Sequence, residues 1–148
     1  TGACLALLIG AGVEPSPLLL VGFSASFAAK LADTFGSEIG KRWGRRPVLI
    51  TTLRSVPPGT EGAISLAGTL ASAAGSVLMT LVMWQLQLLP SISVSLVVML
   101  IGLLATLAES LLGALAQDRF RWLSNELVNA LQTLLAAVMA MLWLGGRI

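Results

Sequence analysis

The most restrictive feature of this sequence is a series of long apolar stretches separated by short polar segments. Four of them, at about 18–40, 62–88, 92–116 and 124–144, are long enough to cross a membrane as helices, which takes about 20 residues each. Because lipid offers no hydrogen-bond partners, only helices or closed barrels satisfy the backbone there. The stretches are rich in Leu, Ala and Gly and lack the alternation of barrel strands. We therefore predict an all-α, polytopic transmembrane helix bundle with four full spans.

The composition agrees with a membrane protein. Hydrophobic residues make up 56% of the 148 residues and charged residues 11%, and the mean hydropathy is +0.91. Histidine is absent, which excludes His-based metal, haem and acid–base chemistry. The single cysteine, Cys4, excludes an intrachain disulfide.

The first apolar stretch, about 1–13, is too short for a complete span. We expect one partial N-terminal helix there, followed by a turn at 14–17. We also expect residues 1–148 to form a single transmembrane domain that is the C-terminal part of a longer chain.

Cationic residues gather in the segments that connect the predicted spans. Counting the crossings puts the connections at 41–61 and 117–123 on one side of the membrane, and Pro90 and the C-terminus on the other. Seven of the nine cationic residues lie on the first side: Lys41, Arg42, Arg45, Arg46, Arg54, Arg119 and Arg121. By the positive-inside rule this side is cytoplasmic, or stromal in a plastid.

Polar residues gather near the ends of the predicted spans that face these basic connections. They are Asp33, Glu38, Glu61, Ser65, Glu109, Gln117, Asn125 and Asn129. This distribution predicts one membrane-embedded site that faces one aqueous compartment. Asp33 lies about 12 Å below Lys41 at 1.5 Å per helical residue, where an isolated carboxylate is costly. Either Asp33 forms a structural ion pair with Lys30 three residues earlier, or it belongs to a functional site, which the polar faces of the other spans favour.

Small polar residues form a stripe of about 60° on the predicted span at 62–88. The stripe consists of Ser65, Thr69, Ser72 and Ser76. Such a stripe is more typical of helix packing than of a ligand site. The glycine spacings Gly36/Gly40 and Gly40/Gly44 likewise favour close packing.

Two predicted spans share a short motif. Leu31-Ala32-Asp33-Thr34 and Leu107-Ala108-Glu109-Ser110 occupy matching positions in two helix–loop–helix units. One interpretation is a parallel repeat, and such repeats place substrate sites between their halves. Glu109 lies on a face of small residues that could line a crevice, so we favour a functional role for it.

The residue types indicate a class of chemistry. Carboxylates recruit Mg²⁺, which usually keeps water and substrate phosphates in its coordination shell. Arg and Lys neutralise phosphate oxygens, and glycine-rich loops expose backbone N–H groups to them. Asn125, Asn129 and Gln132 suit either interhelical hydrogen bonds or phosphate and metal binding. Phosphoryl transfer to or from a lipid fits these features, and a phosphate acceptor needs no strong general base.

Three motifs in order resemble one known membrane family. They are residues 32–40 (ADTFGSEIG), residues 56–69 (VPPGTEGAISLAGT), and residues 109–114 (ESLLGA) with 124–129 (SNELVN). The sequence resembles the integral-membrane family of transmembrane protein 19 and the plastid phytyl-phosphate kinase of vitamin E synthesis. It departs from that pattern at Glu109, where Asp is usual, and at Ala63, where Gly is common. The spacing of Asp33, Ser37, Gly40 and Lys41, with a later Thr60-Glu61-Gly62, is also similar to polyprenol and phytol kinases.

The resemblance implies transfer of a phosphoryl group from a nucleoside triphosphate, CTP among the candidates, to phytyl or another prenyl monophosphate. The diphosphate product would serve tocopherol, quinone or chlorophyll-tail metabolism. The implied catalytic residues are Asp33, Glu38, Glu61 and Glu109, with Asp33, Glu38 and Glu109 as Mg²⁺ ligands. The implied phosphate-binding residues are Ser37, Lys41, Arg45, Arg46, Arg54, Gly59, Thr60, Gly62, Ser65, Asn125 and Asn129.

The resemblance also sets the expected partners and location. We expect membrane lipid, a prenyl phosphate and a nucleotide as partners, no nucleic acid, and a thylakoid or other plastid membrane or a bacterial inner membrane. Two further classes stay open: a non-enzymatic subunit of a large membrane complex, for example a photosynthetic one, and a lipid-phosphate transporter. Stoichiometric pigment with a large partner would favour the first, and vesicle flux without product the second.

Overall fold

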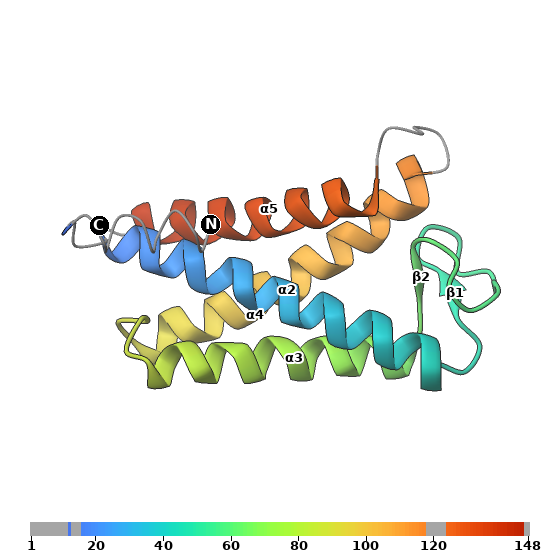
Figure 1. Ribbon diagram of the computed structural model, residues 1–148, viewed down its shortest axis with the longest axis horizontal. Coiled ribbons are helices and arrows are strands. Elements are labelled where there is room, and N and C mark those ends of the chain that lie inside the picture. Colours follow the sequence, from blue (N-terminus) through green and yellow to red (C-terminus); the bar gives the residue numbers. More distant parts are fainter. Residues whose placement is uncertain (1–11, 13–15, 118–123, 147–148) are drawn as a thin grey trace.

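Four long helices form the bundle in the computed structural model, which describes residue 12 and residues 16–117 and 124–146 (Figure 1). They are α2 (Pro17–Trp43), α3 (Leu66–Gln85), α4 (Ile92–Leu112) and α5 (Asn125–Gly145). A short π-helix, η1 (Gly113–Gln117), continues α4. All four are long and apolar enough to cross a membrane, and successive helices run in opposite directions. The predicted transmembrane bundle is confirmed, whereas the expected partial helix at 1–13 and the connection at 118–123 lie outside the described residues.

Each long helix begins directly after a serine. The first N–H groups of a helix have no partner within it, so a side-chain oxygen at the N-cap stabilises the end. The hydroxyl oxygens of Ser16, Ser65, Ser91 and Ser124 each accept a hydrogen bond from the backbone N–H three residues later. The start that we predicted for the span at 62–88 is therefore four residues too early, because α3 begins at Leu66.

The basic connection between α2 and α3 contains two very short strands. β1 (Val48–Leu49) pairs with β2 (Ala63–Ile64) in antiparallel register, and Val48 also bridges Ser55. We predicted only a loop over 41–61, because strands of two residues carry no periodic signal. The hairpin lies across the end of the bundle where α2 ends and α3 begins (Figure 1).

Helix α2 packs against all three other long helices. Its buried face is made of small residues, and Ala25, Ala28, Ala29 and Ala32 are fully buried. Gly75 of α3 contacts the α2 backbone, where a Cβ atom would lie only 2.7 Å from the carbonyl oxygen of Leu31. In the absence of a hydrophobic force between helices, such close contact is what holds membrane helices together.

The packing interpretation of the Gly36/Gly40 spacing is confirmed. A Cβ atom on Gly68 of α3 would lie 3.0 Å from the carbonyl oxygen of Gly36 and 3.3 Å from the Cα of Gly40. The glycines therefore let α2 and α3 approach closely, and the same glycines also line the cavity described below.

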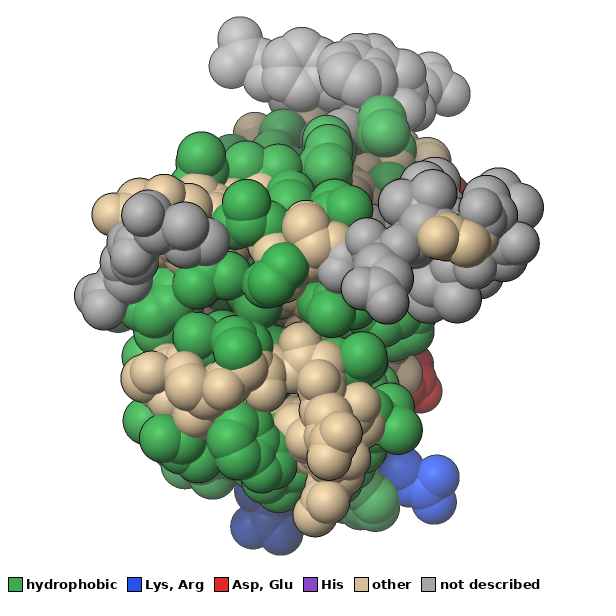
Figure 2. Space-filling model, turned by 90° about the vertical axis from the view of Figure 1, so that its left-hand side faces the viewer, with side chains coloured by type: hydrophobic (Ala, Val, Ile, Leu, Met, Phe, Trp, Pro, Cys, Tyr) green, Lys and Arg blue, Asp and Glu red, His purple; other side chains and the backbone are tan. Residues whose placement is uncertain are grey.

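The outer surface of the bundle suits a lipid environment. Leucines four residues apart on α4, namely Leu96, Leu100 and Leu104, are each 52% exposed. Every charged residue among the described ones belongs to the second half of α2, the connection between α2 and α3, the end of α4 or the first turn of α5. Figure 2 views the opposite end, where the described side chains are mainly apolar or uncharged. The structure thus has one polar end and one apolar end.

We predict that Gly75→Ala destabilises the bundle by about 1–3 kcal/mol, the usual cost of overpacking, because the new methyl group meets α2 backbone. Gly145→Ala is the matched control, since a Cβ there would only touch the Leu18 side chain at 3.8 Å. Thermal unfolding in detergent should show a lower Tm for Gly75→Ala alone. Equal Tm values for the two variants would contradict the proposed contact.

Candidate functional site

A cavity of about 350 Å³ lies at the polar end of the bundle. Its walls come from the second half of α2, the hairpin connection, the start of α3, the end of α4 and the first turns of α5. The volume falls within the range of small-molecule sites. The predicted convergence of polar residues from several spans therefore has a physical counterpart in one cavity.

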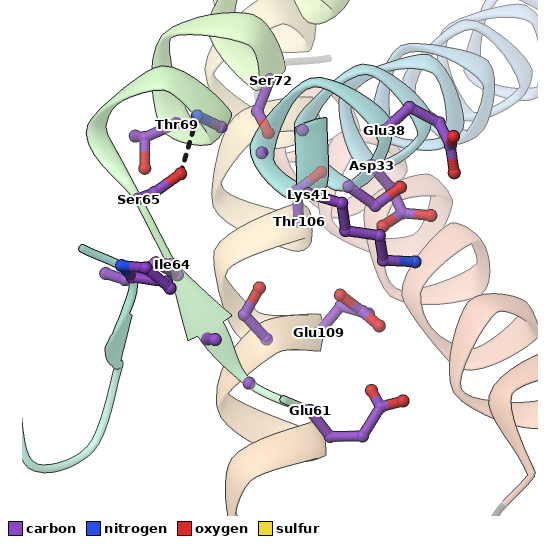
Figure 3. A pocket seen from close by; sticks show the side chains of 18 of the residues that line it. Asp33, Glu38, Lys41, Glu61, Ile64, Ser65, Thr69, Ser72, Thr106 and Glu109 are labelled. Atoms are coloured by element: carbon purple, nitrogen blue, oxygen red, sulfur yellow. Dashed lines mark hydrogen bonds between the residues drawn. The ribbon is translucent and has the colours of Figure 1, made fainter. Parts of the chain in front are cut away.

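Four carboxylates from three segments line this cavity. Asp33 and Glu38 come from α2, Glu61 precedes β2, and Glu109 comes from α4. Figure 3 shows the carboxylates of Glu38, Glu61 and Glu109 extending to the same side of α4. Asp33 and Glu61 both lie close enough to Glu109 for their charges to interact with it. The two acidic positions of the repeated motif, Asp33 and Glu109, thus belong to the same cavity.

The carboxylates are not arranged as a closed metal cage. Within residues 16–117 and 124–146, no three Asp, Glu or Cys side chains stand together as a group that could hold a metal ion. A metal at Asp33, Glu38 or Glu109 would have to take its remaining ligands from water or from a bound substrate.

Lys30 joins α2 to α5 at the inner part of the cavity. Its Nζ donates to Oδ2 of Asp33 at 3.0 Å and to Oδ1 of Asn129 at 2.8 Å. The structural Lys30–Asp33 ion pair that we considered from the spacing is therefore present. All three residues also line the cavity, so the pair does not remove Asp33 from the site.

A buried polar network lies beside the cavity where three helices meet. Nε2 of Gln132 donates to the Ala29 carbonyl oxygen at 3.2 Å and to Oγ1 of Thr106 at 3.0 Å. Thr106 in turn donates to the carbonyl oxygens of Ala29 and Gly102. For Gln132, the interpretation as an interhelical hydrogen-bonding residue is the one observed. The network fixes α5 and α4 against α2 and so holds the cavity walls together.

The loop before α3 has a conformation that requires glycine at two positions. Gly59 and Gly62 have φ values of +88° and +72°, a region that other residues rarely adopt. A Cβ atom on Gly62 would lie 2.6 Å from the backbone nitrogen of Ala114 in η1. Gly62 thus lets the loop lie directly on the end of α4, which brings Glu61 to the cavity beside Glu109.

Most of the site residues predicted from the sequence line this cavity. They are Asp33, Ser37, Glu38, Lys41, Gly59, Thr60, Glu61, Gly62, Ser65, Glu109, Asn125 and Asn129. The small polar stripe on α3 serves two roles. Thr69 and Ser72 line the cavity, whereas Ser76 packs against α4 and donates to the Met99 carbonyl oxygen. The Ser65 oxygen accepts a hydrogen bond at the N-cap of α3, which leaves its hydroxyl proton and one lone pair for a ligand.

Three predicted phosphate-binding residues do not line the cavity. Arg45, Arg46 and Arg54 are exposed on the connection around β1. Thr106 and Ser110 line it but were not predicted as site residues, although both share the helical face of Glu109. Lys30 was predicted only as a structural partner, because its bond to Asn129 joins residues 99 positions apart.

The chain is similar to proteins from bacteria, plants and archaea. It is 43% identical over 141 residues to an uncharacterised membrane protein of the cyanobacterium Synechocystis, a match that covers 95% of this chain and 54% of the relative. It is 42% identical over 134 residues to the chloroplastic protein VTE6 of Arabidopsis thaliana, covering 88% and 40%. It is 39% identical over 123 residues to an uncharacterised membrane protein of Methanocaldococcus jannaschii, covering 83% and 50%.

The chain spans about half the length of the curated relatives it matches. No solved structure matches it. Residues 1–137 match a family described as integral membrane protein DUF92. Since this match covers most of the sequence and agrees with four membrane-spanning helices, the chain belongs to the DUF92 family of integral membrane proteins.

Proposed function

We propose that the protein containing this chain transfers a phosphoryl group from a nucleoside triphosphate to a prenyl monophosphate, and specifically to phytyl phosphate. The observation that carries the proposal is the cavity with four carboxylates at the polar end of a lipid-exposed bundle. The substrate class is supported by the resemblance to the phytyl-phosphate kinase family and by the 42% identity to a chloroplastic plant protein.

The reaction requires positioning and charge neutralisation more than acid–base chemistry. An oxygen of the acceptor monophosphate attacks the γ-phosphorus, the bond from that phosphorus to the β,γ-bridging oxygen breaks, and the nucleoside diphosphate leaves with the bond electrons. Because the attacking oxygen is already ionised, no side chain has to remove its proton. The cavity would therefore act by holding the two phosphates in line.

The charges of the cavity indicate that phosphates would bind there together with a cation. Four carboxylates face only two ammonium groups, those of Lys30 and Lys41, so the lining carries net negative charge. A divalent cation such as Mg²⁺ would neutralise phosphate charge and bridge donor oxygens to the protein. Asp33, Glu38 and Glu109 fit this use, because Mg²⁺ commonly takes one or two carboxylates and completes its shell with phosphate oxygens and water.

The remaining residues suit the donor and the acceptor separately. Lys41 and the loop from Gly59 to Gly62 lie toward the hairpin and suit the donor phosphates. The Thr60 hydroxyl and the backbone N–H of Thr60 already donate to the Pro57 carbonyl oxygen, so the N–H groups of Gly59, Glu61 and Gly62 would serve the phosphates. Asn125 and Asn129 would orient the acceptor phosphate from α5. Arg45, Arg46 and Arg54 lie outside the cavity and would attract the nucleotide from solution rather than hold it at the reacting position.

We predict that Asp33→Asn lowers phosphoryl transfer by about 100-fold or more, the usual cost of removing an electrostatic group from a reacting site. The assay uses full-length protein in nanodiscs with Mg²⁺, phytyl monophosphate and each γ-labelled nucleoside triphosphate, CTP, ATP, GTP or UTP, in turn. Glu126→Gln is the control, since Glu126 is exposed on α5 and does not line the cavity.

Wild-type transfer by folded Asp33→Asn protein would refute the role of Asp33. An absence of product with every nucleotide, from protein shown to be folded, would refute the kinase proposal. Flux of phytyl phosphate across vesicles without any product would then identify a transporter.

Metal dependence gives a second prediction. Chelation by EDTA should abolish transfer, and added Mg²⁺ should restore it. Glu109→Gln should raise the Mg²⁺ concentration for half-maximal transfer by about 10-fold or more, as ligand-shell changes commonly do. Glu109→Asp, which keeps the carboxylate and matches the residue usual in the family, should stay close to wild type. Equal Mg²⁺ dependence of Glu109→Gln and wild type would exclude Glu109 from metal binding.

A further inference from the structure

Lys30 is a cation of the cavity to which the proposed reaction gives no defined task. It lies eleven residues before Lys41 on α2, a separation of about 16 Å along the helix axis. Lys30 is 46% exposed, whereas Asp33 beside it is 15% exposed. An ionisable side chain at this depth in a spanning helix is costly and commonly marks a substrate pathway.

The ammonium group of Lys30 is held in a fixed orientation, but only two of its three N–H donors have partners among the described residues. It has three N–H donors, of which one bonds Asp33 and one bonds Asn129. The third has no partner among the residues that the structure describes. Because Asp33 and Asn129 hold the group in place, it is prepared to bind an anion without further loss of side-chain freedom.

The surroundings of Lys30 change from polar to apolar along α2. Toward the hairpin lie the carboxylates and Lys41, while the described part of α2 before Lys30 has no charged residue. Phe23 and Phe27 precede Lys30 within about 60° of the same helix face at 100° per residue. Their ring centroids lie 4.7 Å apart, and Phe27 is 38% exposed. Phe23 packs partly against the core, so the exposed part of this aromatic pair is Phe27, which helical spacing places one turn from Lys30. A cation and an exposed aromatic ring on one helix face suit a ligand with a charged head and an apolar tail.

We propose that Lys30 and Asn129 bind the phosphate of an apolar-tailed monophosphate that enters from the membrane, with its tail along Phe27 and Phe23. This inference deepens the proposed function and rests on it for the assignment of the ligand as phosphoryl acceptor. The two substrates then reach the cavity from different phases, the nucleotide from water past Lys41 and the lipid from the bilayer past Lys30. The repulsion between the acceptor phosphate and Asp33 would be offset by the divalent cation proposed above.

The test measures binding rather than transfer. Full-length protein in detergent with Mg²⁺ and no nucleotide is titrated with phytyl monophosphate, with phytol and with inorganic phosphate. We expect Lys30→Met to weaken phytyl monophosphate binding by about 10-fold or more, the cost of losing one charge-assisted bond, and to change phytol binding little. Inorganic phosphate should bind far more weakly than the lipid, because it lacks the tail.

Further variants make the test specific. Lys30→Arg keeps the charge and should retain most of the affinity for the monophosphate. Phe27→Ala should weaken phytyl monophosphate and phytol alike, because it removes tail contact only. Lys41→Met should weaken nucleotide binding more than lipid phosphate binding. Glu126→Gln serves as the unchanged control, and Asn129→Leu replaces Lys30→Met if the latter fails to fold.

Unchanged monophosphate binding by folded Lys30→Met protein would overturn the proposed subsite. Equal loss of phytyl monophosphate and phytol binding would also overturn it, because Lys30 would then support the tail site or the fold and not the phosphate. Lys30-dependent binding of the monophosphate in a protein that transfers no phosphoryl group would leave the subsite standing and reject the kinase proposal alone.

Discussion

The structure depends on the close approach of α2 to the other three long helices. A membrane supplies no hydrophobic force between helices, so small side chains and direct backbone contact must hold them together. The fully buried alanines of α2 and the glycines that face it make this contact possible. The same contact exposes backbone carbonyls of α2 to polar side chains of its neighbours, as at Ala29, which accepts from both Thr106 and Gln132. Packing and polar bonding therefore reinforce each other at the centre of the bundle.

Polar atoms in the spanning helices fall into two groups. Most hydroxyls bond a carbonyl one turn earlier or on a neighbouring helix, as Ser24 does with Leu20 and Ser76 with Met99. Among the described residues, only Oγ1 of Thr80 and Oε1 of Gln132 are buried without a partner. The other group comprises the carboxylates, Lys30, Lys41 and the amides that line one cavity. Since polar and charged groups are costly in lipid, their collection in one cavity is more readily explained by function than by stability.

The limits of sequence analysis follow from the physics of each element. Spans of about 20 apolar residues can be recognised from length and composition alone. Counting the crossings then placed Asp33, Glu61 and Glu109 at the same end of the bundle. The pairing of β1 with β2 was missed, because two residues have no period, and with it the path that carries Arg45 and Arg54 away from the cavity. Spacing revealed the ion pair of Lys30 and Asp33 within one helix, but not the bond to Asn129 on α5. Local sequence patterns predict contacts within one helix, whereas contacts between helices can be identified only once the fold is known.

The depth at which each charge lies is the feature that links the fold to the proposed chemistry between two phases. A reaction between a water-soluble donor and a lipid acceptor needs a site reached from both sides, with phosphate charge neutralised along the whole path. The charges follow such an order from the hairpin inward. The exposed arginines lie on the connection after α2, Lys41 and the carboxylates lie at the cavity, and Lys30 lies one helical turn from Phe27. A purely structural bundle has no use for this gradient, because an uncharged helix face would pack at lower cost. The gradient therefore argues for a protein that brings polar and apolar ligands together at the membrane surface.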